Sequence, residues 1–177
     1  MQYTAHYESP LGGLLLAADD VGLTGLWFDG EKYYALHLAR EHEMRQTAVH
    51  EQTAAWLDVY FSGREPDLMP PLHLIGTPFQ QEVWALLRQI PYGKTTTYGA
   101  LAKTLAAQRG LERMSAQAVG GAVGHNEISI LVPCHRVVGT GGSLTGYAGG
   151  VDKKKALLEL EGVSMEGLFV PKRGTAL

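Results

Sequence analysis

Proline and glycine are concentrated in residues 66–78, and this stretch divides the chain into two parts of different character. A composition of this kind is typical of a linker between domains. Residues 1–75 carry four Lys or Arg against eleven Asp or Glu, a net charge of −7, whereas residues 76–177 carry eleven against seven, a net charge of +4. We therefore predict two domains, 1–75 and 76–177. The positive second half favours an anionic partner, although an ordinary dipolar protein would show the same asymmetry.

The first part is predicted to be a small α/β domain. Three strand-like segments are separated by short turns, and two helices and one more strand follow. The expected strands are 3–8, 13–18, 23–28 and 72–75, and the expected helices are 31–43 and 48–61. Five of the seven histidines lie in this half without the spacing of metal ligands, so we read them as surface or core residues and expect no metal site.

The second part begins with a strong helix signal. Thr77 is a candidate N-cap, Pro78 follows at the first helical position, and Gln80 completes a capping box. Two short helices follow, one capped by Thr97 and one by Ser115, with a polar turn between them. Two short helices joined by a turn favour a helix-turn-helix.

The helix after Ser115 is almost without long side chains. Residues 116–124 include three glycines, and each weakens a helix by roughly 1 kcal/mol relative to alanine. Close approach of another surface to the backbone would compensate for this cost. The minor groove of DNA is one candidate for that surface, because bulk is excluded there. The alternative is a close packing face against another helix.

The only cysteine of the chain lies between two apolar segments. Residues 130–132 are predicted to form a strand that ends at Pro133, which places Cys134 at a turn. A neighbouring His135 supplies a base and Arg136 a fixed positive charge, and both favour the reactive thiolate. A lone cysteine is, however, also a common buried apolar residue.

The last helix is predicted over residues 152–161, after a glycine-rich loop at 139–150. Lys153, Lys154 and Lys155 lie in its first turn and Glu161 at its end, and both arrangements oppose the helix macrodipole. We expect the basic run to face phosphate and Glu161 to have a cationic partner such as a buried histidine. Solvent-exposed faces are the alternative.

Composition excludes several classes of protein. A hydrophobic content of 45% is enough for a core, but no apolar run is long enough to cross a bilayer. One cysteine excludes an internal disulfide framework and a zinc site built from several cysteines. We expect a cytoplasmic monomer with no membrane partner, no cofactor and no metal.

The sequence Pro133-Cys134-His135-Arg136-Val137 resembles the active-site signature of the O6-alkylguanine-DNA alkyltransferases. The similarity covers residues 79–162 and includes Asn126, the segments 118–122 and 145–150, and Glu161-Gly162. Residues 1–75 match this family only in layout. The resemblance implies an α+β or α/β protein, in which a ribonuclease-H-like N-terminal α/β domain precedes a mainly helical helix-turn-helix (winged-helix-like) alkyltransferase domain.

The resemblance also implies the chemistry of the site. The protein would repair double-stranded DNA in one irreversible, stoichiometric turnover, transferring the alkyl group of O6-alkylguanine to Cys134; whether O4-alkylthymine is accepted stays open. His135 would take up the thiol proton, Glu161 would orient His135, Asn126 would brace the pocket, and Tyr98 would bind N3 of the guanine. The implied substrate-binding residues are Tyr147, Ala148, Val137 and Gly149.

The same resemblance implies that the flipped base is reached from the minor groove. The implied DNA-binding residues are Ser115, Ala116, Gln117, Ala118, Gly120, Gly121 and Arg136. The chain departs from the family pattern at three of the positions near the site. Gln117 stands where an arginine is usual, Glu127 where proline is common, and Ala148 where serine is frequent.

Three other functions compete with this interpretation. A non-enzymatic lesion sensor of the alkyltransferase-like type lacks the cysteine, so Cys134 argues against it. A cysteine hydrolase would need an oxyanion hole but no small-residue helix. A transcriptional regulator would need sequence readout, for which a helix without long side chains is poorly suited.

Overall fold

The structure is a computed structural model that describes residues 1–172. These residues form a mixed α+β fold. The chain divides into two compact units. Unit 1 comprises residues 1–75 and 127–131, and unit 2 comprises residues 76–126 and the described residues from 132 onwards. The α+β class is confirmed. The domain assignment 1–75 and 76–177 as separately folding parts stays a prediction.

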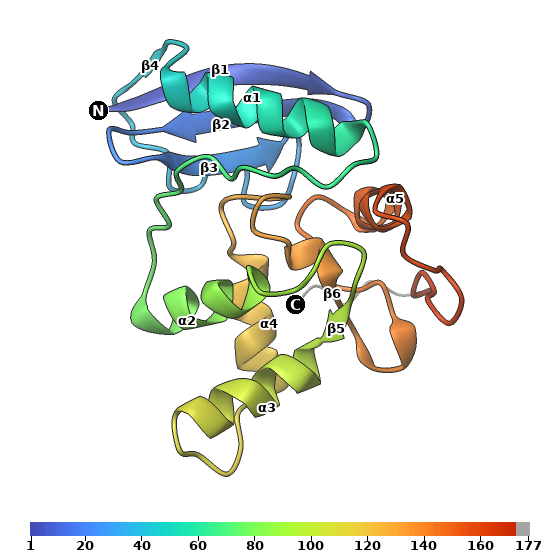
Figure 1. Cartoon of the computed structure of the whole chain (residues 1–177). Helices are drawn as coiled ribbons and strands as arrows, with labels where there is room; N and C mark the ends of the chain where they lie inside the picture. The colour runs from blue at the N-terminus through green and yellow to red at the C-terminus, as the bar shows by residue number, and fades with distance from the viewer. Residues whose placement is uncertain (173–177) are drawn as a thin grey trace. The chain divides into compact units, whose positions relative to one another are not determined.

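Unit 1 is built on a four-stranded sheet with the order β3-β2-β1-β4, and helix α1 lies across one face of it (Figure 1). Burial of apolar side chains between the sheet and the helix drives this packing. Leu14, Leu16 and Phe28 of the sheet are fully buried with Leu57 and Tyr60 of α1. The elements are β1 Gln2–Ser9, β2 Gly12–Ala18, β3 Leu23–Phe28, β4 His42–Met44 and α1 Ala48–Phe61.

The expected helix at 31–43 is wrong. Residues 31–38 form successive turns instead, each closed by a hydrogen bond from a backbone N–H to the carbonyl three residues earlier. Tyr33 and Ala35 have φ angles of 61° and 51°, which a right-handed helix does not allow. His42–Met44 then form β4, which pairs in parallel with β1. All three residues of β4 are exposed, so no pattern of buried residues marks this edge strand in the sequence.

The outer edge of β3 is covered by two short segments rather than by a full strand. The expected strand at 72–75 reduces to one bridge between Leu23 and Leu72. Further along β3, Leu26 N donates to Glu127 O (2.8 Å) and Leu26 O accepts from Ser129 N (3.1 Å). Residues 127–131 therefore belong to unit 1, although they lie between two segments of unit 2.

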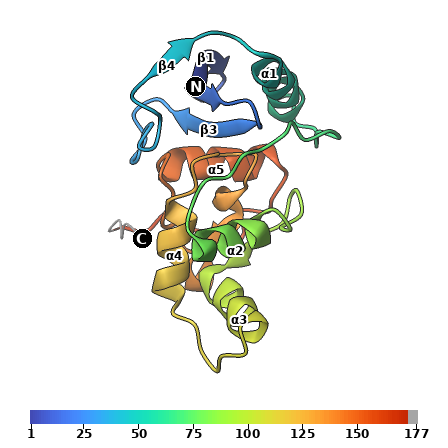
Figure 2. The same ribbon diagram turned by 90° about the vertical axis from the view of Figure 1, so that its left-hand side faces the viewer.

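Within unit 2, helices α2, α3 and α4 pack together (Figures 1 and 2). Their predicted starts are confirmed: Thr77 and Gln80 form a capping box, and the hydroxyls of Thr97 and Ser115 each accept a backbone hydrogen bond. The indole of Trp84 donates to Ala122 O (2.9 Å) and so joins α2 to α4. The elements are α2 Pro78–Leu87, β5 Thr96–Thr97, α3 Tyr98–Gln108, α4 Ala116–Gly124, β6 Val137–Val138 and α5 Val151–Leu160.

The expected strand at 130–132 is also wrong. Ile130 has a φ of 72°, which a β-branched residue rarely adopts, and Leu131 N donates to Ser129 O (2.9 Å) in a tight turn. A second tight turn follows at Pro133, where Cys134 N donates to Val132 O (2.8 Å). Cys134–Arg136 then form one turn of 3-10 helix. The apolar residues 130–132 are buried as expected, but their backbone forms turns and not a strand.

Within residues 1–172 no helix has the length and apolar character that a membrane span requires. The same part of the chain contains no group of His, Cys, Asp and Glu side chains that could hold a metal ion.

Candidate functional site

Cys134 begins a 3-10 turn and is a buried thiol with 6% of its surface exposed. Asn126, just beyond the end of α4, directs its amide at it. Nδ2 of Asn126 donates to Cys134 Sγ (3.3 Å) and to Val132 O (2.9 Å). A hydrogen bond donated to sulfur favours the thiolate over the thiol. The position of Cys134 is therefore not that of a cysteine used only for packing.

His135, Glu161 and Arg136 form a buried hydrogen-bonded group, and His135 and Arg136 directly follow Cys134 in sequence. His135 Nε2 lies 2.5 Å from Glu161 Oε2, and both side chains are fully buried. The other oxygen of Glu161 accepts from Arg136 Nε (2.8 Å) and from the backbone N–H of Gly93 (3.1 Å). Arg136 also donates to Ile90 O (2.7 Å). Glu161 thus has the cationic partner that its place at the end of α5 predicted.

Electrostatics in this group favour a neutral imidazole beside an ionised carboxylate. Burial alone would raise the pKa of Glu161, but hydrogen bonds and charges from His135 and Arg136 outweigh it and lower this pKa to about 2. Burial lowers the pKa of His135, and its bond to Glu161 opposes this only in part. Neutral imidazole can accept a proton, which a catalytic base requires.

A second polar cluster centres on Lys154, the middle residue of the basic run. Lys154 is completely buried, and its Nζ donates to Val137 O (2.5 Å) and Thr145 O (2.7 Å). Burial lowers the pKa of Lys154 to about 8, while the charge of Cys134 opposes this shift. Tyr98 Oη donates to the same carbonyl of Thr145 (3.1 Å). Lys154 therefore does not face phosphate, contrary to expectation, and joins Tyr98 to the segment that follows Cys134.

Tyr98 reaches this cluster because of a short strand pair. Residues 96–97 pair in parallel with Val137–Val138, and Thr97 caps α3 directly before Tyr98. Burial raises the pKa of Tyr98, and the nearby Cys134 charge adds to the effect. The phenol therefore stays protonated and acts as a hydrogen-bond donor.

The predicted substrate-binding residues lie in or beside these clusters to different degrees. Val137 is fully buried, and its carbonyl is bound by Lys154. Tyr147 is buried, and its ring meets that of His135 edge-on with centroids 6.4 Å apart. Ala148 and Gly149 are half-buried in the loop before α5.

The predicted DNA-binding residues are mostly on the exposed start of α4. Ser115, Ala116, Gln117 and Ala118 are exposed, Gly121 is half-buried and Gly120 is buried. A Cβ added to Gly121 would meet no atom within 4 Å. Packing within the described structure therefore does not require a glycine at this position.

Arg136 differs from the rest of that set. It is buried, donates to Glu161 and Ile90, and lies over the ring of Tyr92 (5.7 Å to the centroid). A guanidinium held in this way is suited to support Glu161. Its proposed contact with DNA stays a prediction that the burial does not favour.

Sequence reasoning missed Lys154 and the supporting role of Arg136. The signal for Lys154 was present: it precedes Leu157 and Leu158 by three and four residues, and all three are buried on one face of α5. The run of three lysines concealed this, because a run of like charges usually marks a solvent-exposed face.

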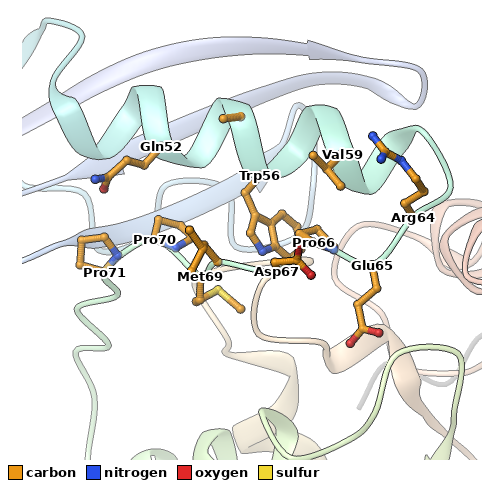
Figure 3. Close-up of a pocket in the computed structure, with 12 residues that line it drawn as sticks. Gln52, Trp56, Val59, Arg64, Glu65, Pro66, Asp67, Met69, Pro70 and Pro71 are labelled. Carbon is orange, nitrogen blue, oxygen red and sulfur yellow. The ribbon is translucent and has the colours of Figure 1, made fainter.

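A cavity of about 590 Å³ in unit 1 is not part of this site. It lies between α1 and residues 64–71, and Figure 3 shows Trp56 directed from the helix toward the proline-rich segment. None of the predicted site residues lines it.

Comparison with known proteins identifies the family. Residues 78–163 match the family model described as 6-O-methylguanine DNA methyltransferase, DNA binding domain, and residues 2–74 match the one described as 6-O-methylguanine DNA methyltransferase, ribonuclease-like domain. The chain is 43% identical over 159 residues to the methylated-DNA–protein-cysteine methyltransferase of Mycobacterium tuberculosis, covering 88% of this chain and 92% of the relative. It is 40% identical over 161 residues to that of Methanosarcina acetivorans, covering 90% and 98%.

Comparison with solved structures points to the same family. The M. tuberculosis OGT in complex with DNA superposes with a TM-score of 0.77 at 41% identity, over 90% of this chain and 92% of that chain. An O6-methylguanine DNA methyltransferase from Methanococcus jannaschii superposes with a TM-score of 0.60 at 26% identity, over 97% and 99%. The two matched models together span almost all of the described residues. The chain therefore belongs to the O6-alkylguanine-DNA alkyltransferase family, with a ribonuclease-like first part and a DNA-binding second part.

Proposed function

We propose that this protein repairs double-stranded DNA by transferring the alkyl group of O6-alkylguanine irreversibly to its own Cys134. One observation carries the proposal: the only cysteine is held by Asn126 and is followed by a buried base, His135, that is bound to an ionised Glu161. This combination of nucleophile, base and orienting group activates a thiol. The family to which the chain belongs supports the substrate.

The thiol proton leaves first. Glu161 binds Nε2 of His135, so Nδ1 is the nitrogen that takes up the proton, directly or through a water. The resulting imidazolium is stabilised by the Glu161 carboxylate. Arg136 and the Gly93 N–H in turn fix that carboxylate. Loss of the proton leaves a thiolate with a hydrogen bond from Asn126.

The thiolate then displaces the purine. A bond forms between Cys134 Sγ and the alkyl carbon, the bond from that carbon to O6 breaks, and its electron pair stays on the guanine. Hydrogen bonds from Tyr98 Oη at N3 and from the Ala148 N–H at O6 stabilise the negative charge that develops on the guanine, which becomes neutral when it takes up the proton that the thiol lost. Tyr98 Oη donates to Thr145 O in the present structure, so it has to exchange this partner for the base.

Base recognition follows from the neighbouring backbone. The carbonyls of Cys134 and Val137 accept from the exocyclic amine of guanine, and Tyr147 and Gly149 line the base. Lys154 Nζ donates a hydrogen bond to the Val137 carbonyl and so fixes its position. The product is a thioether, and no second cysteine exists to remove it, so each molecule acts once.

DNA binding is proposed to occur through α4 in the minor groove. Ser115, Ala116, Gln117 and Ala118 present an exposed surface of short side chains, and the open surface at Gly121 lies one turn after Gln117. Gly120 adds no side chain to the helix. A groove that excludes bulk matches this surface, and extrusion of the base brings its O6 to the buried thiol. We also propose the cytoplasm as the place of action, because the reaction needs a reduced thiol.

The stoichiometry of repair tests the proposal. Limiting protein is mixed with an excess of duplex containing one O6-methylguanine, and the restored guanine is counted over time. We expect a plateau at one guanine per protein and none with Cys134→Ala. Continued turnover, or repair by Cys134→Ala, would contradict the proposal.

A further inference from the structure

Glu127 is a buried carboxylate that has no part in the steps above. Its Oε2 accepts from the indole Nε1 of Trp27 (3.0 Å), and its Oε1 lies 2.6 Å from His37 Nδ1. The side chain of Glu127 is 10% exposed, whereas that of His37 is 66% exposed. The backbone carbonyl of Glu127 also accepts a hydrogen bond from Leu26 N on β3 (2.8 Å). Glu127 is therefore fixed to unit 1 through both its side chain and its main chain.

The residue before Glu127 is the one that holds the thiol. Asn126 is the last residue of its segment in unit 2, and Glu127 is the first residue of the segment in unit 1. The peptide bond between them is a rigid plane, so the position of Glu127 restricts the backbone of Asn126. Both hydrogen bonds of the Asn126 amide, to Val132 O and to Cys134 Sγ, depend on the direction of its side chain.

We propose that Glu127 is a positioning residue for alkyl transfer: Trp27 and His37 anchor its carboxylate, and the anchored Glu127 holds Asn126 in the orientation that binds Cys134 Sγ. This inference rests on the proposed transfer to Cys134. Glu127 touches neither the thiol nor the base and acts only through Asn126.

A purely stabilising role does not account for this arrangement equally well. An ion pair with an exposed histidine contributes little to stability, and burial of the Glu127 carboxylate has a desolvation cost. The chain offers a direct comparison in the same unit. His73 Nδ1 lies 2.6 Å from Asp19 Oδ2, the same pairing at the same distance, but neither residue adjoins the site in sequence.

Four variants separate positioning from stability: Glu127→Ala, Glu127→Pro, His37→Ala and the matched control His73→Ala. Proline has no carboxylate but fixes its own φ and restricts the residue before it, so Glu127→Pro restrains Asn126 by another means. Three quantities are measured for each variant. They are the first-order rate of methyl transfer at saturating O6-methylguanine duplex, the Kd for that duplex, and the rate at which iodoacetamide alkylates Cys134 without DNA.

We expect transfer to slow about tenfold in Glu127→Ala, which corresponds to about 1.4 kcal/mol, and about threefold in His37→Ala, which removes only one of the two contacts of the carboxylate. Glu127→Pro should return to within about twofold of the original rate, a difference well below that of one hydrogen bond. His73→Ala should react at the original rate, and Kd should be unchanged throughout. Alkylation by iodoacetamide should slow in the same order, because Asn126 no longer stabilises the thiolate.

Two results would overturn the inference. One is transfer and alkylation in Glu127→Ala and His37→Ala at the rates of the unchanged protein. The other is a Glu127→Pro variant as slow as Glu127→Ala, which would assign the effect to charge and not to position. If the unchanged protein takes up no methyl group, the proposed function fails instead, and the iodoacetamide rates still decide whether Glu127 positions Asn126.

Discussion

At the scale of single residues, the site depends on one buried carboxylate that binds two basic side chains. Glu161 binds His135 with one oxygen and Arg136 with the other. Replacement by glutamine keeps the shape of the side chain but removes the charge that stabilises imidazolium. We therefore expect Glu161→Gln to slow transfer on bound DNA by roughly 10²-fold, a magnitude typical of general acid–base catalysis.

Single-turnover rates and binding of O6-methylguanine duplex check this prediction. Glu159→Gln is the matched control, because Glu159 lies on the exposed face of α5 and pairs only loosely with Lys155 (3.8 Å). Its rate should be unchanged. A Glu161→Gln variant with weakened affinity but an unchanged rate on bound DNA would show that Glu161 does not orient the base.

Lys154 offers a second test at this scale. Its ammonium is buried beside two carbonyls and interacts with the charge of Cys134. Lys154→Met fills a similar volume without charge, so we expect slower transfer, by about tenfold for the loss of two charge-assisted hydrogen bonds. The thermal unfolding temperature should fall, since the carbonyls of Val137 and Thr145 lose a hydrogen-bond donor. Unchanged transfer in a folded Lys154→Met would remove Lys154 from the site.

At the scale of elements, α4 combines a weak helix sequence with an open surface. Gly121 is half-buried, and an added Cβ would meet no described atom. We expect Gly121→Ala to stabilise the protein by about 0.5–1 kcal/mol, because alanine is the better helix former. The same methyl group should weaken DNA binding if α4 enters the minor groove.

Chemical denaturation and DNA affinity, measured on the same preparation, decide this point. Gain of stability together with loss of affinity is the expected pair of results. Gain of stability with unchanged affinity would move the DNA contact away from this face of α4.

The elements also show which parts of the fold are readable from sequence. Helices α2 and α4 were predicted because local hydrogen bonds, accepted by the hydroxyls of Thr77 and Ser115, determine where they begin. The conformation of residues 130–132 was not predicted, because an apolar run indicates burial but not backbone conformation. Here the chain makes two tight turns, one at Ile130 and one at Pro133. The edge strand β4 depends on pairing with β1, which no local pattern of its own residues indicates.

The candidate site also contains residues that could be predicted from the sequence and residues that could not. Cys134 and His135 were identified from a short motif, and Asn126 was identified only from the resemblance to the family. The cationic partner of Glu161 was expected from its unfavourable place at a helix end. The burial of Lys154 and Arg136 depends on tertiary contacts between segments distant in sequence, such as Arg136 with Ile90. These contacts are not encoded in any one stretch of the chain.

At the scale of the whole molecule, the buried charges couple stability to pH. The folded state lowers the pKa of Glu161 to about 2 from a usual value of 4.5, so its contribution is present above pH 4.5 and is lost as pH falls toward 2. The lowered pKa of buried His135 acts in the same direction below pH 6.5, because the unfolded chain then binds more protons.

We therefore expect the free energy of unfolding to fall steadily from pH 6.5 to pH 2. Glu161 alone contributes up to about 3 kcal/mol of this change. Urea unfolding across this range measures it, and Glu161→Gln should flatten the acid end of the curve. A variant with the same acid dependence as the unchanged protein would exclude Glu161 as its source.

The identity of the alkylated atom is the most direct test of the whole account. The protein is incubated with duplex carrying O6-methylguanine, and its intact mass and peptides are determined by mass spectrometry. The account predicts the gain of a single methyl group, located on Cys134, with none in Cys134→Ala. Methyl transfer to any other residue, or loss of methyl from the DNA without a mass change in the protein, would contradict it.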